Sequence, residues 1–119
     1  MTRRDVLLGL ALAGLAAEAA AHAMLERAEP AVGSTVRAAP PALRLHFSER
    51  IEPSLSAIEV RDAAGKRVDG GKLEAAGDGT VLAVPLPTPL APGRYKVVWR
   101  AVSVDTHVTQ GDFSFTVAP

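Results

Sequence analysis

Apolar and polar residues alternate with a period of two in several segments of the chain after residue 22. The segments 43–47, 58–60 and 113–117 each carry a large apolar side chain at every second position, with polar or charged residues between. Such alternation places one set of side chains on a buried face of a strand and the other set in solvent. No segment of this part has a sustained helical period, so the pattern predicts an all-β fold.

Turn-forming residues divide the alternating segments at short intervals. Glycine and proline cluster at Pro40-Pro41, at Gly70-Gly71 and between Pro85 and Gly93, and Gly111 precedes the last segment. Short strands with such regular punctuation are typical of a β-sandwich. We expect seven strands, near residues 25–29, 42–48, 56–62, 67–74, 80–85, 94–102 and 112–118.

The first 21 residues have a different pattern. Thr2-Arg3-Arg4 precedes an apolar run from Val6 to Ala17, and small residues follow as far as Ala21. A charged start, a short apolar stretch and an A-x-A end are typical of a secretory signal peptide. The run is shorter and richer in alanine than a membrane span, which needs about 20 apolar residues. We therefore expect a signal peptide and then one exported domain, with the bounds 1–21 and 22–119 if cleavage follows Ala21. The arginine pair also resembles a twin-arginine export signal.

Two cleavage sites fit this signal. Cutting after Ala19-Ala20-Ala21 makes His22 the first residue of the exported protein, whereas cutting after Ala21-His22-Ala23 discards that histidine. The pattern by itself leaves both sites open, and the choice decides whether His22 can take part in any chemistry.

Composition narrows the classes of function. The chain has 119 residues, which is enough for one domain. It has 13 basic and 13 acidic side chains, and only one Trp, one Tyr and three Phe. It therefore has neither a basic stripe nor a stacking platform of aromatic residues for nucleic acid. Trp99 alternates with Tyr95 and Val97 in a predicted strand, and we assign it to the core. Cysteine is absent, which excludes disulfides and thiolate sites and leaves His, Asp, Glu and Met as metal ligands.

The densest cluster of such ligands is Asp105-Thr106-His107. Asp105 and His107 are two residues apart, so in an extended backbone their side chains leave the same face and can converge on one ion. An isolated D-x-H motif is short and common, and a surface loop is the alternative interpretation. His22 adds weight to a metal site, because an N-terminal histidine offers both its α-amine and its ring nitrogen. Three nitrogens and one oxygen suit copper(II) better than a closed zinc site.

Several motifs together resemble the CopC family of periplasmic copper-resistance proteins. They cover the exported part in order and with matching spacing, and they are His22 after an Ala-rich signal, Leu43–Glu49, Gly93–Val97, Trp99–Ser103, Asp105-Thr106-His107 and Phe113-x-Phe115-x-Val117. The resemblance implies a seven-stranded Ig-like Greek-key sandwich or barrel, located in the periplasm. It also implies copper(II) ligands at His22, Asp105 and His107, and hence cleavage after Ala21.

The resemblance further implies a carrier or buffer of copper(II) in copper resistance, and not an enzyme. We expect a monomer that passes copper to a membrane transporter of the CopD type. Two other functions remain open: a copper oxidoreductase with an N-terminal histidine brace, and a metal-free Ig-like interaction module. The first needs an extended substrate surface, and the second predicts no tight copper binding.

Two further residues, Glu49 and His46, have two interpretations each. Glu49 matches a glutamate that the family places near copper(II), or it is a solvated carboxylate at a strand end. His46 supports the site from outside, or it is a surface histidine. Ser103 and Thr106 are adjacent to the ligands and could orient them by hydrogen bonds. Segment 63–82 contains no methionine, so we expect a single copper(II) site without a thioether site for copper(I).

Overall fold

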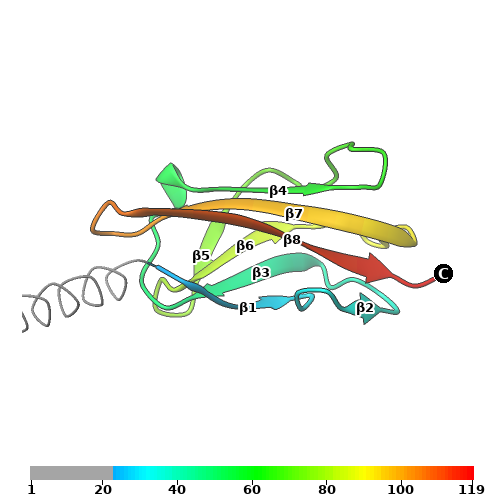
Figure 1. The fold of residues 1–119 in the computed structure, drawn as a ribbon, viewed down its shortest axis with the longest axis horizontal. Coiled ribbons are helices and arrows are strands. Elements are labelled where there is room, and N and C mark those ends of the chain that lie inside the picture. Colours follow the sequence, from blue (N-terminus) through cyan, green and yellow to red (C-terminus); the bar gives the residue numbers. More distant parts are fainter. Residues whose placement is uncertain (1–22) are drawn as a thin grey trace, which may run out of the picture.

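Residues 23–119, which the computed structural model describes, form two four-stranded β-sheets packed face to face (Figure 1). One sheet has the order β1-β3-β6-β5 and the other the order β2-β8-β7-β4, and neighbours are antiparallel except for β2 and β8. The predicted all-β, Ig-like sandwich is therefore confirmed. The strands are β1 (Leu25–Glu29), β2 (Thr35–Val36), β3 (Ala42–Phe47), β4 (Ala57–Arg61), β5 (Glu74–Ala76), β6 (Val81–Pro85), β7 (Gly93–Val102) and β8 (Val108–Val117), and a short 3-10 helix η1 (Pro53–Leu55) precedes β4.

The core lies between the sheets and consists of the apolar residues that alternate in the sequence. Leu43, Leu45 and Phe47 of β3 are buried, as are the apolar residues at every second position of β7 and of the second half of β8. Trp99 packs edge-on against Phe47, with ring centroids 5.4 Å apart. The assignment of Trp99 to packing is therefore correct.

The predicted strand over 67–74 is largely wrong. Regular pairing begins only at Glu74, and before it a single bridge joins Arg61 to Arg67. The carboxylate of Asp69 explains the difference, because it accepts hydrogen bonds from the backbone N–H groups of Val60 and Gly71, both at 2.8 Å. A side chain thus satisfies donors that a β-ladder would otherwise use.

Strand β8 begins at Val108, four residues earlier than the last predicted strand, and Gly111 lies inside it. Gly111 pairs with Trp99 on β7, and a Cβ atom at this position would lie 2.9 Å from Cζ2 of the indole ring. The glycine therefore marks a close approach of the Trp99 ring and not a turn. As a consequence, Asp105-Thr106-His107 lies in the connection between β7 and β8.

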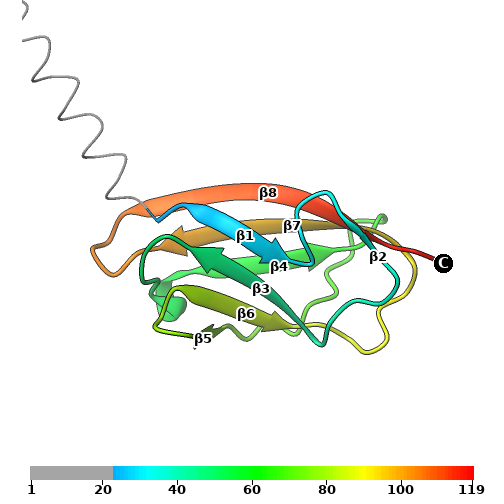
Figure 2. The same cartoon turned by 90° about the horizontal axis from the view of Figure 1, so that it is seen from below.

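One end of the sandwich brings together segments that are far apart in the sequence. The β7–β8 connection (residues 103–107), helix η1 and the start of β1 (residues 23–25) lie at this end, and the C-terminus lies at the other (Figures 1 and 2). We call it the hairpin end. No helix within residues 23–119 is long and apolar enough to cross a membrane.

Candidate metal centre

The β7–β8 hairpin ends in a tight connection that its own backbone hydrogen bonds define. The strands pair from Gly93 opposite Val117 to Val102 opposite Val108. In the connection, the N–H of Ser103 donates to the carbonyl of His107 at 2.9 Å, and the N–H of Thr106 donates to the carbonyl of Ser103 at 2.8 Å. Thr106 has a φ of 72°, a left-handed conformation that is uncommon for a residue other than glycine. The turn is thus held in one specific conformation.

This turn brings the side chains of Asp105 and His107 together. Oδ1 of Asp105 lies 3.2 Å from Nδ1 of His107, and the two side chains are 47% and 49% exposed. The sequence-based argument from an extended backbone is wrong, because residues 104–106 form a turn and a bend. The side chains meet through the turn at Thr106 and not through the period of a strand.

Ser103 supports the carboxylate of Asp105 from inside. The serine is 1% exposed, and its hydroxyl donates a hydrogen bond to Oδ1 of Asp105. That bond, together with the neighbouring His107, lowers the pKa of Asp105 below its usual value. The hydroxyl of Thr106 instead donates to the backbone carbonyl of Asp105, at 2.5 Å. Ser103 therefore contacts the Asp105 carboxylate, and Thr106 stabilises the turn.

Glu49 lies close to the same connection. Its Oε2 atom is buried and has no hydrogen-bond partner. With Ser103 and Asp105 it lines a surface hollow of about 430 Å³, to which Asp78 also contributes. A buried carboxylate oxygen without a donor is unfavourable unless a cation or water satisfies it. The interpretation of Glu49 as a fully solvated carboxylate is therefore wrong for this oxygen.

The start of the described chain is fixed at the hairpin end. Ala23 is fully buried, and its carbonyl accepts a hydrogen bond from Oγ1 of Thr109 at 2.8 Å. Met24 pairs with Ser48 through its N–H (2.8 Å) and its carbonyl (2.9 Å). Ala23 therefore lies beside β8 at Thr109, two positions after His107. His22 itself lies outside the described residues.

His46 is engaged elsewhere. Its Nε2 atom lies 3.1 Å from Oε1 of Glu29 and 3.5 Å from a guanidinium nitrogen of Arg27, its cross-strand neighbour on β1. The hydrogen bond from His46 lowers the pKa of Glu29. These partners belong to the outer face of the β1–β3 pair, which agrees with the interpretation of His46 as a surface histidine.

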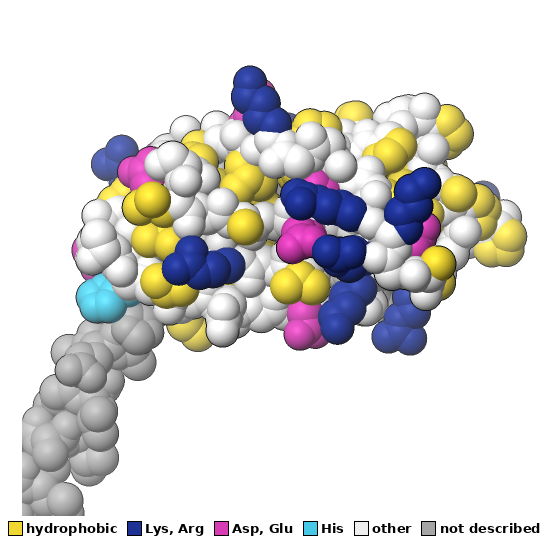
Figure 3. All heavy atoms as spheres, turned by 90° about the horizontal axis from the view of Figure 1, so that it is seen from above, with side chains coloured by type: hydrophobic (Ala, Val, Ile, Leu, Met, Phe, Trp, Pro, Cys, Tyr) yellow, Lys and Arg dark blue, Asp and Glu magenta, His cyan; other side chains and the backbone are white. Residues whose placement is uncertain are grey.

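The hairpin end offers two converging donors and one nearby carboxylate. Across residues 23–119, no three His, Asp or Glu side chains are grouped so that they could hold a metal ion by themselves. Asp105 and His107 supply one anionic oxygen and one imidazole, both accessible to solvent. Figure 3 shows a histidine side chain at one end of the described molecule, with hydrophobic side chains close by. This arrangement can ligate a cation if further donors complete it.

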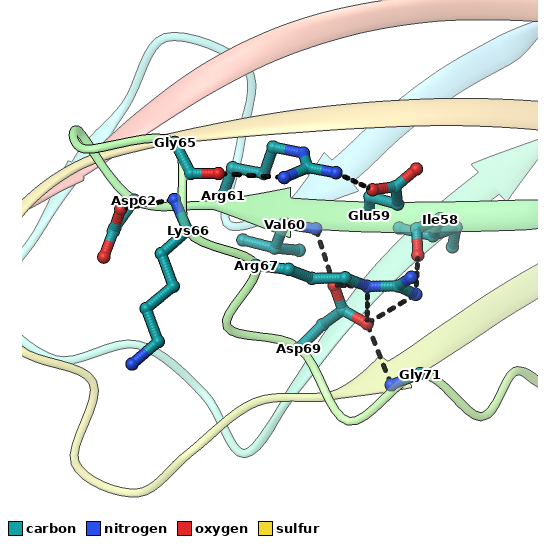
Figure 4. Close-up of polar contacts among 10 residues, drawn as sticks. All are labelled: Ile58, Glu59, Val60, Arg61, Asp62, Gly65, Lys66, Arg67, Asp69 and Gly71. Carbon is teal, nitrogen blue, oxygen red and sulfur yellow. Dashed lines mark hydrogen bonds and ion pairs between the residues drawn. The ribbon is translucent and has the colours of Figure 1, made fainter.

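A second polar group of residues, which the sequence did not indicate, surrounds Asp69 (Figure 4). The Asp69 side chain is fully buried, and it accepts hydrogen bonds from Nε of Arg67 at 2.9 Å and from the backbone N–H groups of Val60 and Gly71. Burial acts to raise the pKa of Asp69, but these hydrogen bonds outweigh it and the pKa is lowered. With its oxygens occupied, Asp69 is a structural residue. The spacing Arg67-x-Asp69 before Gly70-Gly71 was the only signal of it in the sequence.

Comparison with known proteins gives a consistent result. A family model for the CopC domain matches residues 25–118. Protein YobA of Escherichia coli K12 is 39% identical over 100 residues, which cover 82% of this chain and 79% of that protein. Copper resistance protein C of Xanthomonas campestris pv. juglandis is 37% identical over 107 residues, covering 85% of this chain and 84% of that protein.

Two further matches concern architecture. The crystal structure of CopC from Methylosinus trichosporium OB3b superimposes with a TM-score of 0.75 at 34% identity, covering 82% of this chain and 95% of that one. Copper transport protein CutJ of Bacillus subtilis is 32% identical over 98 residues, which cover 82% of this chain but only 18% of CutJ. In CutJ, the matching region is thus a small part of a much longer protein.

Proposed function

Because this chain belongs to the CopC family, we propose that it is a copper-handling protein that carries or buffers copper(II) outside the cytoplasm and is not an enzyme. Copper is its cargo, and the proposed ligands are His22, Asp105 and His107. One observation carries this proposal: Oδ1 of Asp105 lies 3.2 Å from Nδ1 of His107, and Thr109, two residues after His107, donates a hydrogen bond to the carbonyl of Ala23, the residue that follows His22 in the sequence.

The chemistry of the donors favours copper(II). With cleavage after Ala21, His22 offers its α-amine and a ring nitrogen, and His107 and Asp105 add a nitrogen and an oxygen. Such nitrogen and oxygen donors suit the tetragonal preference of copper(II). Like any aspartate of ordinary or lowered pKa, Asp105 is ionised at neutral pH, so its carboxylate can bind a cation without first losing a proton.

Glu49 is a further candidate ligand in this proposal. Its buried, unpartnered Oε2 atom and its place in the same hollow as Asp105 support a role near the bound cation. A nearby positive charge would satisfy that oxygen, whereas nothing else in the described part of the chain does so.

Copper(I) is not the expected cargo. It prefers soft thioether ligands, and the part of the chain after residue 22 contains one methionine, Met24. We expect weak copper(I) binding in a competition assay under reducing conditions. Tight capture of copper(I) would contradict a single copper(II) site.

Location and partner follow from the same proposal. Residues 1–21 act as a signal peptide that is removed after Ala21, and residues 22–119 act in the periplasm as a monomer. The receiving protein is a membrane transporter of the CopD type. CutJ supports this pairing, since a copper transport protein contains the matching region as 18% of its length.

Copper(II) titration of the exported protein tests the proposal. His22→Ala and His107→Ala should each weaken binding by at least 10²-fold, about 2.7 kcal/mol, because each removes ligating nitrogen. His46→Ala is the matched control, since His46 pairs with Glu29 on the outer face of the β1–β3 pair, and it should titrate like the wild type. A His107→Ala variant with wild-type affinity would show that the assignment of this ligand is wrong.

A further inference from the structure

A hollow of about 600 Å³ lies on the outer face of the β2-β8-β7-β4 sheet, near the start of β7. Its lining comes from β4, β7 and β8 and from the turn after β4, and three of its side chains are basic: Arg61, Arg94 and Lys96. We call it the cationic hollow. It shares no residue with the hollow that Glu49 and Asp105 line. Figure 3 looks onto this face, where Lys and Arg side chains gather on the half away from the histidine.

The strand register makes the basic side chains direct neighbours. Lys96 on β7 pairs with Arg61 on β4 and with Ser114 on β8, so these three residues form a row across the sheet. Neighbouring strands lie about 4.8 Å apart. Arg94 precedes Lys96 by two residues and shares its face, about 6–7 Å along the strand. Both are exposed, whereas Tyr95 between them is buried. The basic side chains are therefore one continuous group.

The guanidinium of Arg61 is held at the wall of the cationic hollow (Figure 4). One of its terminal nitrogens donates a hydrogen bond to the carbonyl of Gly65 at 2.8 Å, and the other donates to Oε1 of Glu59 at 2.5 Å. Gly65 belongs to the turn that follows β4 and itself lines the hollow. Arg61 is thus fixed in position, and Glu59 balances part of its charge.

Arg94 and Lys96 have no partner of this kind. Neither side chain forms an ion pair or a hydrogen bond within residues 23–119. Lys96 instead lies directly opposite another cation, Arg61. Like charges directly opposite one another in a sheet are destabilising. An anion bound between these side chains would relieve that repulsion, because it attracts all three.

Two carboxylates also line the cationic hollow, Asp62 and Asp112. Oδ1 of Asp62 accepts hydrogen bonds from the N–H groups of Ala64 and Lys66, at 3.0 Å and 2.9 Å, so this carboxylate is engaged in its own turn. Asp112 lies opposite Val98 and not opposite a basic residue. Neither carboxylate forms an ion pair with a basic side chain of the hollow. The two cations of β7 are therefore available to an anion from outside the chain.

We propose that the cationic hollow binds a phosphate group, with Arg61, Arg94 and Lys96 as donors and the hydroxyl of Ser114 beside them. The planar guanidinium of arginine matches two phosphate oxygens at once, and lysine adds a compact positive charge. Free phosphate and the headgroup of an anionic phospholipid both present this group. The inference does not depend on the copper(II) site, because the hollow contains none of the proposed copper ligands.

Two binding measurements on the purified, exported protein without copper test the proposal. Inorganic phosphate is titrated at low ionic strength, and the amide chemical shifts of the protein give the dissociation constant. Replacing both Arg94→Gln and Lys96→Gln removes two charged donors, so binding should weaken about tenfold or more. The matched control combines Arg44→Gln with Lys72→Gln, which removes two charges at exposed positions outside the hollow. We expect the control to bind like the wild type. All four positions are exposed, so both double variants should fold.

Co-sedimentation with vesicles distinguishes the source of the phosphate group. Vesicles that contain phosphatidylglycerol and phosphatidylcholine in equal parts are compared with vesicles of phosphatidylcholine alone, for the wild type and both double variants. Binding of inorganic phosphate, of the anionic vesicles or of both supports the proposal if the Arg94 and Lys96 variant loses it and the control does not. The proposal is overturned if the wild type binds neither. Equal weakening by the two double variants also overturns it, because net charge alone would then explain the binding.

Discussion

Asp69 and Asp105 lie in two different regions of the molecule and show how one residue type serves two purposes. Both carboxyl groups have a lowered pKa. Asp69 is fully buried behind β4, whereas 47% of the Asp105 side chain is exposed at the hairpin end. Arg67 and two backbone N–H groups occupy the oxygens of Asp69, whereas Asp105 is bonded to a neutral hydroxyl and lies beside a histidine.

The partner of each carboxylate explains the difference. Arginine stays protonated under all ordinary conditions, so Arg67 is a permanent counterion that leaves no room for a metal. Histidine loses its proton near neutral pH and then offers a lone pair to a metal. A lowered pKa therefore does not identify a binding site. Exposure and the nature of the partner distinguish the two regions.

The largest expected effect on stability comes from Asp69. Asp69→Ala removes the partner of Arg67 and leaves the N–H groups of Val60 and Gly71 without acceptors, so we expect the free energy of unfolding to fall by about 3 kcal/mol. Urea unfolding at pH 7 measures it. The protein that remains folded should bind copper(II) with wild-type affinity. A loss of affinity in this folded fraction would mean that the two regions are coupled.

Asp105→Ala should have the opposite effects, with weaker copper(II) binding and little change in the free energy of unfolding. It removes a ligand at an exposed position, so copper(II) affinity should fall by about tenfold, or 1.4 kcal/mol. The free energy of unfolding should change by less than about 0.5 kcal/mol, as for most surface substitutions. The same titration and urea unfolding provide both values. A large loss of stability with unchanged copper binding would make Asp105 a structural residue like Asp69.

Low pH should change the stability of the two regions differently, and this effect is smaller than those of the two alanine substitutions. Because the pKa of Asp69 is lowered in the folded state, its ionisation stabilises the fold above the unfolded value of about 3.9, and this contribution is lost as the pH falls through the folded value. The stability difference between wild type and Asp69→Asn should therefore narrow below about pH 4. Asp105→Asn should show little such narrowing, because solvent screens its interactions. Unfolding curves at pH 7 and pH 3 test this, and a constant difference for Asp69→Asn would contradict it.

The sequence predicted the buried positions of the core more accurately than the places where the strands begin and end. Alternation in 43–47 and 113–117 was sufficient, because burial follows the period of a strand. Gly111 was mistaken for a turn, since only the fold brings the Trp99 ring against it. The segment 67–74 was mistaken for a strand. In the structure, the side chain of Asp69 accepts the hydrogen bond of the Val60 N–H group, nine residues away in sequence, which a neighbouring strand would otherwise accept.

The candidate site was predictable in its residues but not in its geometry. Asp105 and His107 do meet, although through a turn at Thr106 that no local pattern indicated. The buried oxygen of Glu49 belongs to a residue that lines a hollow with Asp78 and Asp105, which lie far from it in the sequence. Such contacts have no signature in a single sequence.

The most direct test of the copper(II) site compares two purified forms of the protein, one starting at His22 and one extended by Ala20-Ala21. In the extended form the nitrogen of His22 is an amide, so the chelate formed by the amine and the ring is lost. Direct titration with copper(II) should give an affinity at least 10²-fold lower for the extended form, about 2.7 kcal/mol. Equal affinities would contradict the proposed site, because they would show that the N-terminal amine does not bind the metal.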